Sequence, residues 1–153
     1  MIKKIIIAID GYSSTGKSTL AQMLAQHLNY KHINTGSMYR AVTLYAIRNN
    51  WIEYIDNKLR IQEEQIVRSI DFLHLDFSSH NNSYRMHIDN EDVEDEIRTQ
   101  KVSNLVSQIS QYPLIREKIV LMQQNIGINK GVVMEGRDIG SVVFPQAELK
   151  LFI

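Results

Sequence analysis

Residues 3–28 decide the fold, and they read KKIIIAIDGYSSTGKSTLAQMLAQHL. Residues 3–9 are mostly β-branched and apolar on both faces, which is typical of a strand buried within a parallel sheet. Leucines recur every fourth residue over residues 17–28, so this stretch is predicted to form an amphipathic helix. The segment between them, rich in glycine and hydroxyl groups, therefore joins a buried strand to a helix.

The joining segment, residues 11–18, matches the pattern G-x-x-x-x-G-K-[ST] in full. Its glycines let the backbone wrap closely around phosphates, and the helix that follows adds its positive N-terminal dipole. A chance glycine-rich turn would not require the buried strand before it and the helix after it. We expect Lys17 to reach the β- and γ-phosphates and the Ser18 hydroxyl to hold Mg²⁺. The residues expected to bind the nucleoside triphosphate are Gly11, Ser13, Ser14, Thr15, Gly16, Lys17, Ser18 and Thr19.

The rest of the chain continues an alternation of strands and helices, with one interruption. Further strands are predicted at residues 30–34, 131–135 and 149–153, and further helices at residues 36–49, 102–109 and 115–126. In the interruption, residues 52–70 are polar and predicted to be helical in their second half, and strands at residues 72–77 and 84–88 flank a polar hairpin loop at residues 78–83. We predict an α/β fold with a P-loop NTPase-type parallel sheet. Its core comprises residues 1–34 and 111–153, and residues 35–110 form an inserted subdomain with a small antiparallel sheet.

Composition excludes several classes of function. The 153 residues favour one domain with a sizeable core, and 17 basic residues balance 17 acidic ones. This balance argues against nucleic acid or an anionic membrane as a partner. The absence of cysteine excludes disulfides, thiolate metal sites and cysteine nucleophiles. No apolar run approaches a membrane span, and residues 1–10 lack the features of a signal peptide, so a cytoplasmic protein is expected.

Two arginines suggest what receives the phosphate. The sequence lacks the D-x-x-G and N-K-x-D motifs that a GTPase would need. Arg40 ends the segment TGSMYR, residues 35–40, on the first turns of a predicted helix, where it could hold a second phosphate. Arg137 follows another predicted strand, at the carboxyl edge where open α/β sheets bind their ligands. The pattern favours a kinase that acts on a small molecule.

At these residues the sequence resembles bacterial cytidylate kinases, which are P-loop nucleoside monophosphate kinases. The matching segments run in order through nearly the whole chain: IDGYSSTGKST (9–19), TGSMYR (35–40), EDVEDEIRTQKVSNLVSQIS (91–110), YPLIREKI (112–119) and EGRDIGSVVFPQA (135–147). The resemblance implies transfer of the γ-phosphoryl group of ATP, with Mg²⁺, to CMP or dCMP, giving CDP or dCDP and ADP. It also implies a sheet in the order 2-3-1-4, a nucleoside-monophosphate-binding (NMP-binding) role for the insertion, and a monomer in the full-length form.

The resemblance further assigns residues to the acceptor nucleotide. Thr35, Tyr39, Arg40 and Arg137 are expected to contact it, with both arginines on its phosphate. Lys17 and Arg137 are the expected catalytic residues, because they would neutralise the charge on the transferred group.

Three more residues are expected, from the resemblance, to read the cytosine. Arg116 can only donate hydrogen bonds, which suits the N3 and O2 acceptors of the base. Asp138 and Ser107 can accept from its N4 amino group. Uracil reverses the donor pattern at two of these positions, which would leave buried groups unpaired and disfavour it.

Five of the residues assigned to the acceptor also have a simpler, non-functional interpretation. Arg40 could be a charge on a helix surface, and Ser107 a serine beside an apolar stripe. Arg116 could cap or pair locally, and Arg137 and Asp138 could pair with other residues.

The acidic run at residues 89–96, with six carboxylates, could suggest a cation site. It lacks the glycine and the spacing of an EF-hand, and acidic residues favour the N-terminal dipole of a helix. We therefore predict the solvated start of a helix there.

The sequence departs from the family pattern at three positions. Thr35 stands where serine is common, Tyr12 where proline is common, and Glu135 where aspartate is common, so the role of Glu135 stays open. The family also continues beyond the last strand with a lid, so we expect this chain to bind nucleotide weakly and to turn over little. The alternatives are a kinase for UMP, AMP or a shikimate-type acceptor, and a nucleotide-binding module without catalysis.

Overall fold

The structure is a computed structural model that describes residues 2–80 and 83–153. The strands are β1 (Ile6–Asp10), β2 (Lys31–Asn34), β3 (Ile52–Ile55), β4 (Lys58–Ile61), β5 (Leu75–His80), β6 (Ser83–Ile88), β7 (Glu91–Asp92), β8 (Val132–Gly136) and β9 (Leu149–Phe152). The helices are α1 (Lys17–Leu28), α2 (Thr35–Arg48), α3 (Glu63–Ile70), α4 (Gln100–Ile109) and α5 (Pro113–Ile126), with short helical turns η1 (Glu96–Arg98) and η2 (Ile139–Val143). None of the helices in the described ranges is long and apolar enough to span a membrane.

The chain divides into two compact units. The first, which we call the sheet unit, contains the chain up to Gly36 together with Ser79–Tyr84 and Val120–Ile153. The second, which we call the helical unit, contains Ser37–Ser78 and Arg85–Ile119.

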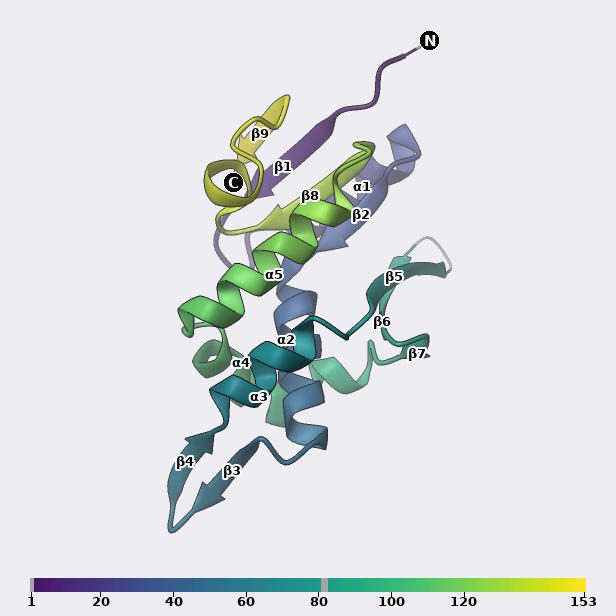
Figure 1. Ribbon diagram of the computed structural model, residues 1–153. Helices are drawn as coiled ribbons and strands as arrows, with labels where there is room; N and C mark the ends of the chain where they lie inside the picture. Colours follow the sequence, from purple (N-terminus) through teal and green to yellow (C-terminus); the bar gives the residue numbers. More distant parts are fainter. Residues whose placement is uncertain (1, 81–82) are drawn as a thin grey trace. The chain divides into compact units, whose positions relative to one another are not determined.

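Four parallel strands form the sheet of the sheet unit, in the order β2-β8-β1-β9 (Figure 1). Counted along the chain these are the second, third, first and fourth strands of the sheet, so the expected order 2-3-1-4 is confirmed. Residues Ile6 to Ile9 of β1 are all buried, because neighbouring strands flank β1 and both faces of the sheet are covered. This burial on both faces explains the continuous apolar run in the sequence of β1.

Helix α1 packs on one face of this sheet through small residues. Ala21 and Ala25 are buried in a cluster with Ile7, Ile9 and Val133. The leucine stripe expected to form this contact lies beside it: Leu20 and Leu24 are partly buried, and Leu28 is 41% exposed. The predicted helix is confirmed, but its buried face is rotated from the leucine stripe to the alanines. Alanines allow the helix backbone to approach the strands closely.

The helical unit holds a hairpin that the sequence analysis missed. Strands β3 and β4 pair antiparallel where a polar stretch was predicted. Asp56 and Asn57 join them with positive φ angles of 52° and 61°, as a tight hairpin turn requires. The helix predicted in the second half of residues 52–70 is confirmed as α3.

The polar tract at residues 78–83 was predicted to be a loop, and this is wrong over most of its length. β5 continues to His80 and β6 begins at Ser83, while residues 81 and 82 lie outside the described residues. Polar side chains do not prevent strand pairing, because the pairing is made by the backbone. β6 pairs antiparallel with the short strand β7, so the small antiparallel sheet is confirmed.

Strand β9 lies at the edge of the parallel sheet, and it carries exposed apolar side chains. Phe152 is 73% exposed, and its ring meets the exposed ring of Tyr12 edge to face, with 6.2 Å between the ring centroids. An apolar edge strand of this kind favours association with other chains when nothing covers it.

Candidate functional site

The glycine-rich loop turns sharply between β1 and α1. Gly16, directly before the helix, has a φ of 85°, a conformation that glycine adopts without a steric penalty. Ser14 also has a positive φ, 63°. The Thr15 hydroxyl donates to the carbonyl oxygen of Tyr12 at 2.8 Å and closes the loop. Thr19 lies exposed in the first turn of α1, so all the residues expected to bind the triphosphate stand on this loop or at the start of this helix.

Two cationic side chains donate hydrogen bonds to neighbouring residues of the loop. Lys17 Nζ donates to the carbonyl oxygen of Tyr12 at 3.2 Å. Arg137 donates through NH2 to the Ser13 hydroxyl at 2.7 Å, across 124 positions of sequence. The structure therefore brings the second expected cation to the loop. A loop with exposed backbone and two cations suits a polyanion such as a phosphate chain.

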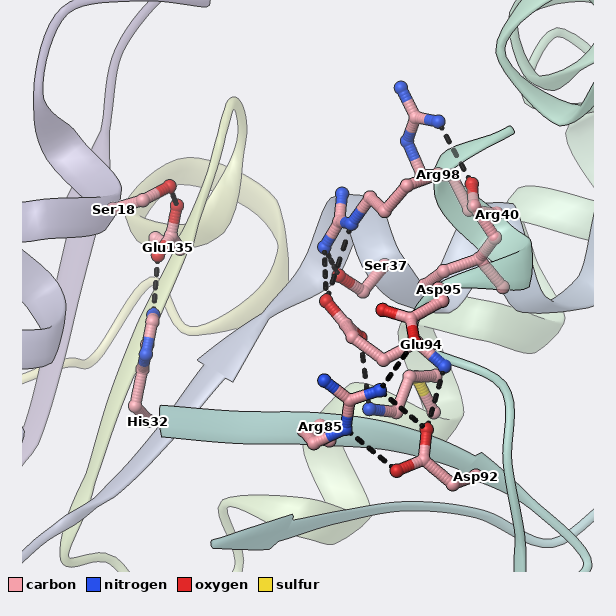
Figure 2. Close-up of polar contacts among 12 residues, drawn as sticks. Ser18, His32, Ser37, Arg40, Arg85, Asp92, Glu94, Asp95, Arg98 and Glu135 are labelled. Atoms are coloured by element: carbon pink, nitrogen blue, oxygen red, sulfur yellow. Dashed lines mark hydrogen bonds and ion pairs between the residues drawn. The ribbon is translucent and has the colours of Figure 1, made fainter. Parts of the chain in front are cut away.

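Glu135, whose role the sequence left open, holds the Ser18 hydroxyl. Ser18 Oγ donates to Glu135 Oε1 at 2.5 Å, as Figure 2 shows, and the carboxylate belongs to a residue that is only 2% exposed. Because this bond uses the hydroxyl hydrogen, the lone pairs of the serine oxygen are left to face a cation.

Thr35 lies at the start of α2 and is buried. Its hydroxyl donates to the carbonyl oxygen of Glu135 at 2.7 Å. The side chain expected to contact the acceptor thus also fastens the end of β2 to the end of β8.

Asp10 is a site residue that the sequence analysis missed. Its two carboxylate oxygens accept the backbone N–H groups of Ile139 at 2.8 Å and of Gly140 at 2.9 Å. These bonds fix the segment after β8 that carries Arg137 and Asp138. The available signal was an acidic residue directly after the strand predicted at residues 3–9, but its partners are about 130 residues away in sequence.

In the helical unit, Arg40 is held by two acceptors. Its NH1 donates to the carbonyl oxygen of Ile97 at 3.0 Å and to the Ser103 hydroxyl at 2.9 Å. Burial, and then the nearby positive charge of Arg98, lower the pKa of the Arg40 guanidinium. Arg40 is thus a braced and partly buried side chain, which the surface-charge interpretation does not explain.

Arg98 is a second braced cation of this unit, and the sequence analysis gave it no role. Its NH2 donates to the Ser37 hydroxyl at 2.6 Å and to Glu94 Oε1 at 3.0 Å (Figure 2). Glu94 in turn accepts the backbone N–H of Met86 at 3.0 Å. Ser37 belongs to the TGSMYR segment, so this network fixes the helix turn next to Arg40.

The side chains of Arg116 and Tyr39 are in contact, and both residues are expected to contact the acceptor nucleotide. The Arg116 guanidinium carbon is 5.6 Å from the centroid of the Tyr39 ring, a cation–π contact. Arg116 also donates to the carbonyl oxygen of Ser110, at the end of α4, at 3.3 Å. Local capping is therefore present, as the simpler interpretation held. Ser107 lies exposed on α4 in the same unit, whereas Asp138 belongs to the sheet unit.

The acidic run is paired with arginines and is largely exposed, as predicted, but only its last residue, Glu96, lies in a helical turn, so the prediction of a helix start is wrong for most of the run. Arg48 contacts Glu91 at 2.9 Å and Glu96 at 2.8 Å, and Arg85 contacts Asp92 at 2.7 Å. Hydrogen bonds from Arg48 and Arg85 respectively lower the pKa values of Glu91 and Asp92. The long helix α4 begins only at Gln100, after a strand and a short turn.

Metal ligands of the carboxylate or imidazole type do not gather anywhere in residues 2–80 and 83–153: no group of three or more could hold an ion. A cation at the glycine-rich loop would be held by few protein groups together with phosphate oxygens. Mg²⁺ commonly binds in this manner and keeps several waters.

Comparisons with known proteins agree with the motifs. Residues 7–153 match the cytidylate kinase family. A cytidylate kinase of Flavobacterium psychrophilum is 50% identical over 154 residues, which cover 99% of this chain and 66% of that protein. Cytidylate kinases of Flavobacterium johnsoniae and Chloroherpeton thalassium are each 46% identical; the matches cover 99% and 100% of this chain, and 65% and 62% of those proteins. The chain thus spans slightly less than two thirds of the length of these relatives.

Proposed function

Since this chain belongs to the cytidylate kinase family, we propose that it binds ATP and CMP or dCMP and carries out phosphoryl transfer between them. The products are ADP and CDP or dCDP. The attachment of Lys17 and Arg137 to one glycine-rich loop carries the proposal on the structural side. Such a pair can neutralise phosphates on the donor and on the group being transferred.

In this mechanism the donor is held mainly by backbone. The N–H groups of the loop and of the first turn of α1 bind the β- and γ-phosphates, and Lys17 exchanges its contact with Tyr12 for phosphate oxygens. An oxygen of the acceptor phosphate attacks the γ-phosphorus in line, and the bond to the β,γ-bridging oxygen breaks. The chain contributes positioning and opposite charge, which supply most of the catalysis in phosphoryl transfer.

Ser18 fits a magnesium ion at this loop. Its hydrogen is donated to Glu135, and its oxygen lone pairs suit a hard cation that prefers oxygen ligands. Bound with the triphosphate, Mg²⁺ would neutralise charge on the β- and γ-phosphate oxygens.

Residues 35–110 are proposed to act as the NMP-binding insertion into a core formed by residues 1–34 and 111–153. Thr35, Tyr39 and Arg40 would contact the acceptor nucleotide, with Arg40 and Arg137 on its phosphate. The bracing of Arg40 by Ser103 supports this role, because a guanidinium that is already positioned loses less freedom when it binds.

Cytosine would be read by Ser107, Arg116 and Asp138. The contact of Arg116 with the Tyr39 ring supports its part, because it restricts the guanidinium before the base arrives. A cytoplasmic location, a monomeric full-length form and weak turnover by these 153 residues alone stay predictions.

The proposal is tested by offering CMP, dCMP, UMP and AMP to the purified chain with ATP and Mg²⁺. ADP release and the affinity of each monophosphate are measured together. We expect CMP and dCMP to bind more tightly than UMP and to be the acceptors that release ADP. Preference for UMP or AMP would move the chain to another acceptor class. Binding of nucleotides without any ADP release would support a binding module.

A further inference from the structure

The buried carboxylate of Glu135 has a second side-chain partner besides Ser18. His32, on β2, contacts Glu135 Oε2 through its Nε2 atom, while Ser18 contacts Oε1, so the carboxylate lies between them (Figure 2). β2 pairs with β8 in a register that places His32 opposite Val133 and Asn34 opposite Glu135. The imidazole reaches diagonally across the two strands.

Each atom in this chain of contacts has a defined role. An ionised carboxylate can only accept, so His32 donates from Nε2, and the tautomer that carries hydrogen on Nε2 is the one that fits. The side chains of His32 and Glu135 are 11% and 2% exposed. A carboxylate buried to this extent requires donors from the protein, and His32 and Ser18 supply one to each oxygen.

The imidazole and the carboxylate are themselves held in place. The Tyr84 ring packs edge to face against His32, with 6.3 Å between the centroids and 88° between the planes. The backbone carbonyl of Glu135 accepts from Thr35. The bond from His32 restrains rotation of the Glu135 carboxylate.

We infer that His32 is a positioning residue for Ser18. By holding one carboxylate oxygen it keeps the other aimed at the Ser18 hydroxyl, which directs the serine lone pairs toward a cation bound with the triphosphate. The inference rests on the proposed function, since it assumes that Ser18 faces Mg²⁺ and ATP. Lys17 instead donates to the carbonyl oxygen of Tyr12, so we expect ATP binding without Mg²⁺ not to depend on His32.

The test compares the affinity of the chain for ATP with and without Mg²⁺, by equilibrium titration. The measured quantity is the gain in affinity that Mg²⁺ brings. His32→Leu removes the donor, and we expect it to reduce this gain about tenfold, the lower end of the range for partners of metal ligands. His32→Gln retains a side-chain N–H and should recover most of the gain. His27→Leu, at an exposed position on α1, is the matched control and should change nothing.

A double-mutant cycle separates positioning from a general loss of structure. In a Ser18→Ala background, His32→Leu should have no further effect on the Mg²⁺ gain, because the residue through which it acts is absent. The same loss in both backgrounds, or an equal loss of ATP affinity with and without Mg²⁺, would overturn the inference. So would an unchanged gain in His32→Leu. An unmodified chain that does not bind ATP would instead refute the proposed function.

Discussion

The two compact units use different amino acids to build their parts of the site. All seven glycines of the chain lie in the sheet unit, and the helical unit has none. The arginines show the opposite pattern: seven of the eight lie in the helical unit, and Arg137 alone lies in the sheet unit.

This contrast agrees with what each unit is mainly proposed to bind, although Arg137 and Asp138 of the sheet unit are also proposed to contact the acceptor nucleotide. A chain of phosphates can be surrounded by backbone N–H groups, which requires close approach and therefore glycine. A nucleoside monophosphate must be held by its phosphate and distinguished by its base, which requires side chains that reach and select. The braces on Arg40, Arg98 and Arg116 show that long flexible cations need other side chains to fix them.

The largest loss of activity is expected when Lys17 of the sheet unit is replaced. In a full-length form, Lys17→Ala should lower CMP-dependent ADP release at least about a hundredfold, because the phosphates lose a charge-assisted donor within the loop. Its contact with Tyr12 is one hydrogen bond near the surface, so the circular dichroism spectrum and the melting temperature should stay unchanged. Lys101→Ala, exposed on α4, is the control. A wild-type rate in Lys17→Ala would refute the assignment of the loop.

The helical unit should be sensitive to the shape of a cation as well as to its charge. Arg40→Lys keeps the positive charge but loses the planar fork that contacts Ile97 and Ser103. We expect the dissociation constant for CMP to rise about tenfold, while that for ATP stays the same. Arg60→Lys, exposed on β4, should alter neither constant. Equal weakening of ATP and CMP would contradict the division of labour between the units.

Close approach of backbone in the sheet unit can be tested with a single methyl group. A Cβ at Gly136 would lie 2.4 Å from Thr35 Oγ1 and 2.8 Å from Ile139 Cδ1. Gly136→Ala should therefore reduce the free energy of unfolding in urea by about 1–3 kcal/mol, the range for overpacking. Gly36→Ala meets its nearest atom, Asn34 Oδ1, at 3.2 Å and should change stability by less than about 1 kcal/mol. Equal stability of the two variants would show that the sheet unit does not need the close backbone packing that glycine allows at residue 136.

The smallest effect is expected from the exposed ion pairs of the helical unit. Arg48 lowers the pKa of Glu91 below its ordinary value of 4.5, mainly through hydrogen bonding. The unfolded chain then binds more protons than the folded chain near this pH. The stabilisation by the pair is therefore present above about pH 4.5 and is lost as the pH falls through the folded-state pKa.

Melting temperatures of the unmodified chain and of Arg48→Met at pH 7 and pH 3 measure this effect. The two proteins should differ slightly at pH 7, since exposed ion pairs contribute little, and the difference should become smaller at pH 3. A difference of the same size at both pH values would mean that Arg48 stabilises the unit through packing alone.

Local patterns were sufficient for much of the fold. The strand–loop–helix unit at the start, the order of the sheet and four of the five helices agree closely with the predictions, and α3 was predicted without its bounds. Hydrophobic periodicity and contiguous motifs depend on residues that are close in sequence, so they predicted these local elements correctly. The β3–β4 hairpin was missed although Asp56 and Asn57 mark its turn and Lys58–Ile61 alternates polar and apolar residues, because strands of only four residues give a weak periodic signal.

By itself, the sequence determined the glycine-rich loop, the parallel sheet and the family to which the chain belongs. Only the tertiary structure decided how the side chains of the candidate site are held: Asp10 on the segment after β8, Arg98 on Ser37, and His32 on the carboxylate that receives Ser18. These contacts join residues 61 to 130 positions apart. No local pattern encodes such pairs, because hydrogen-bond partners are selected by the packing of strands and helices after the chain has folded.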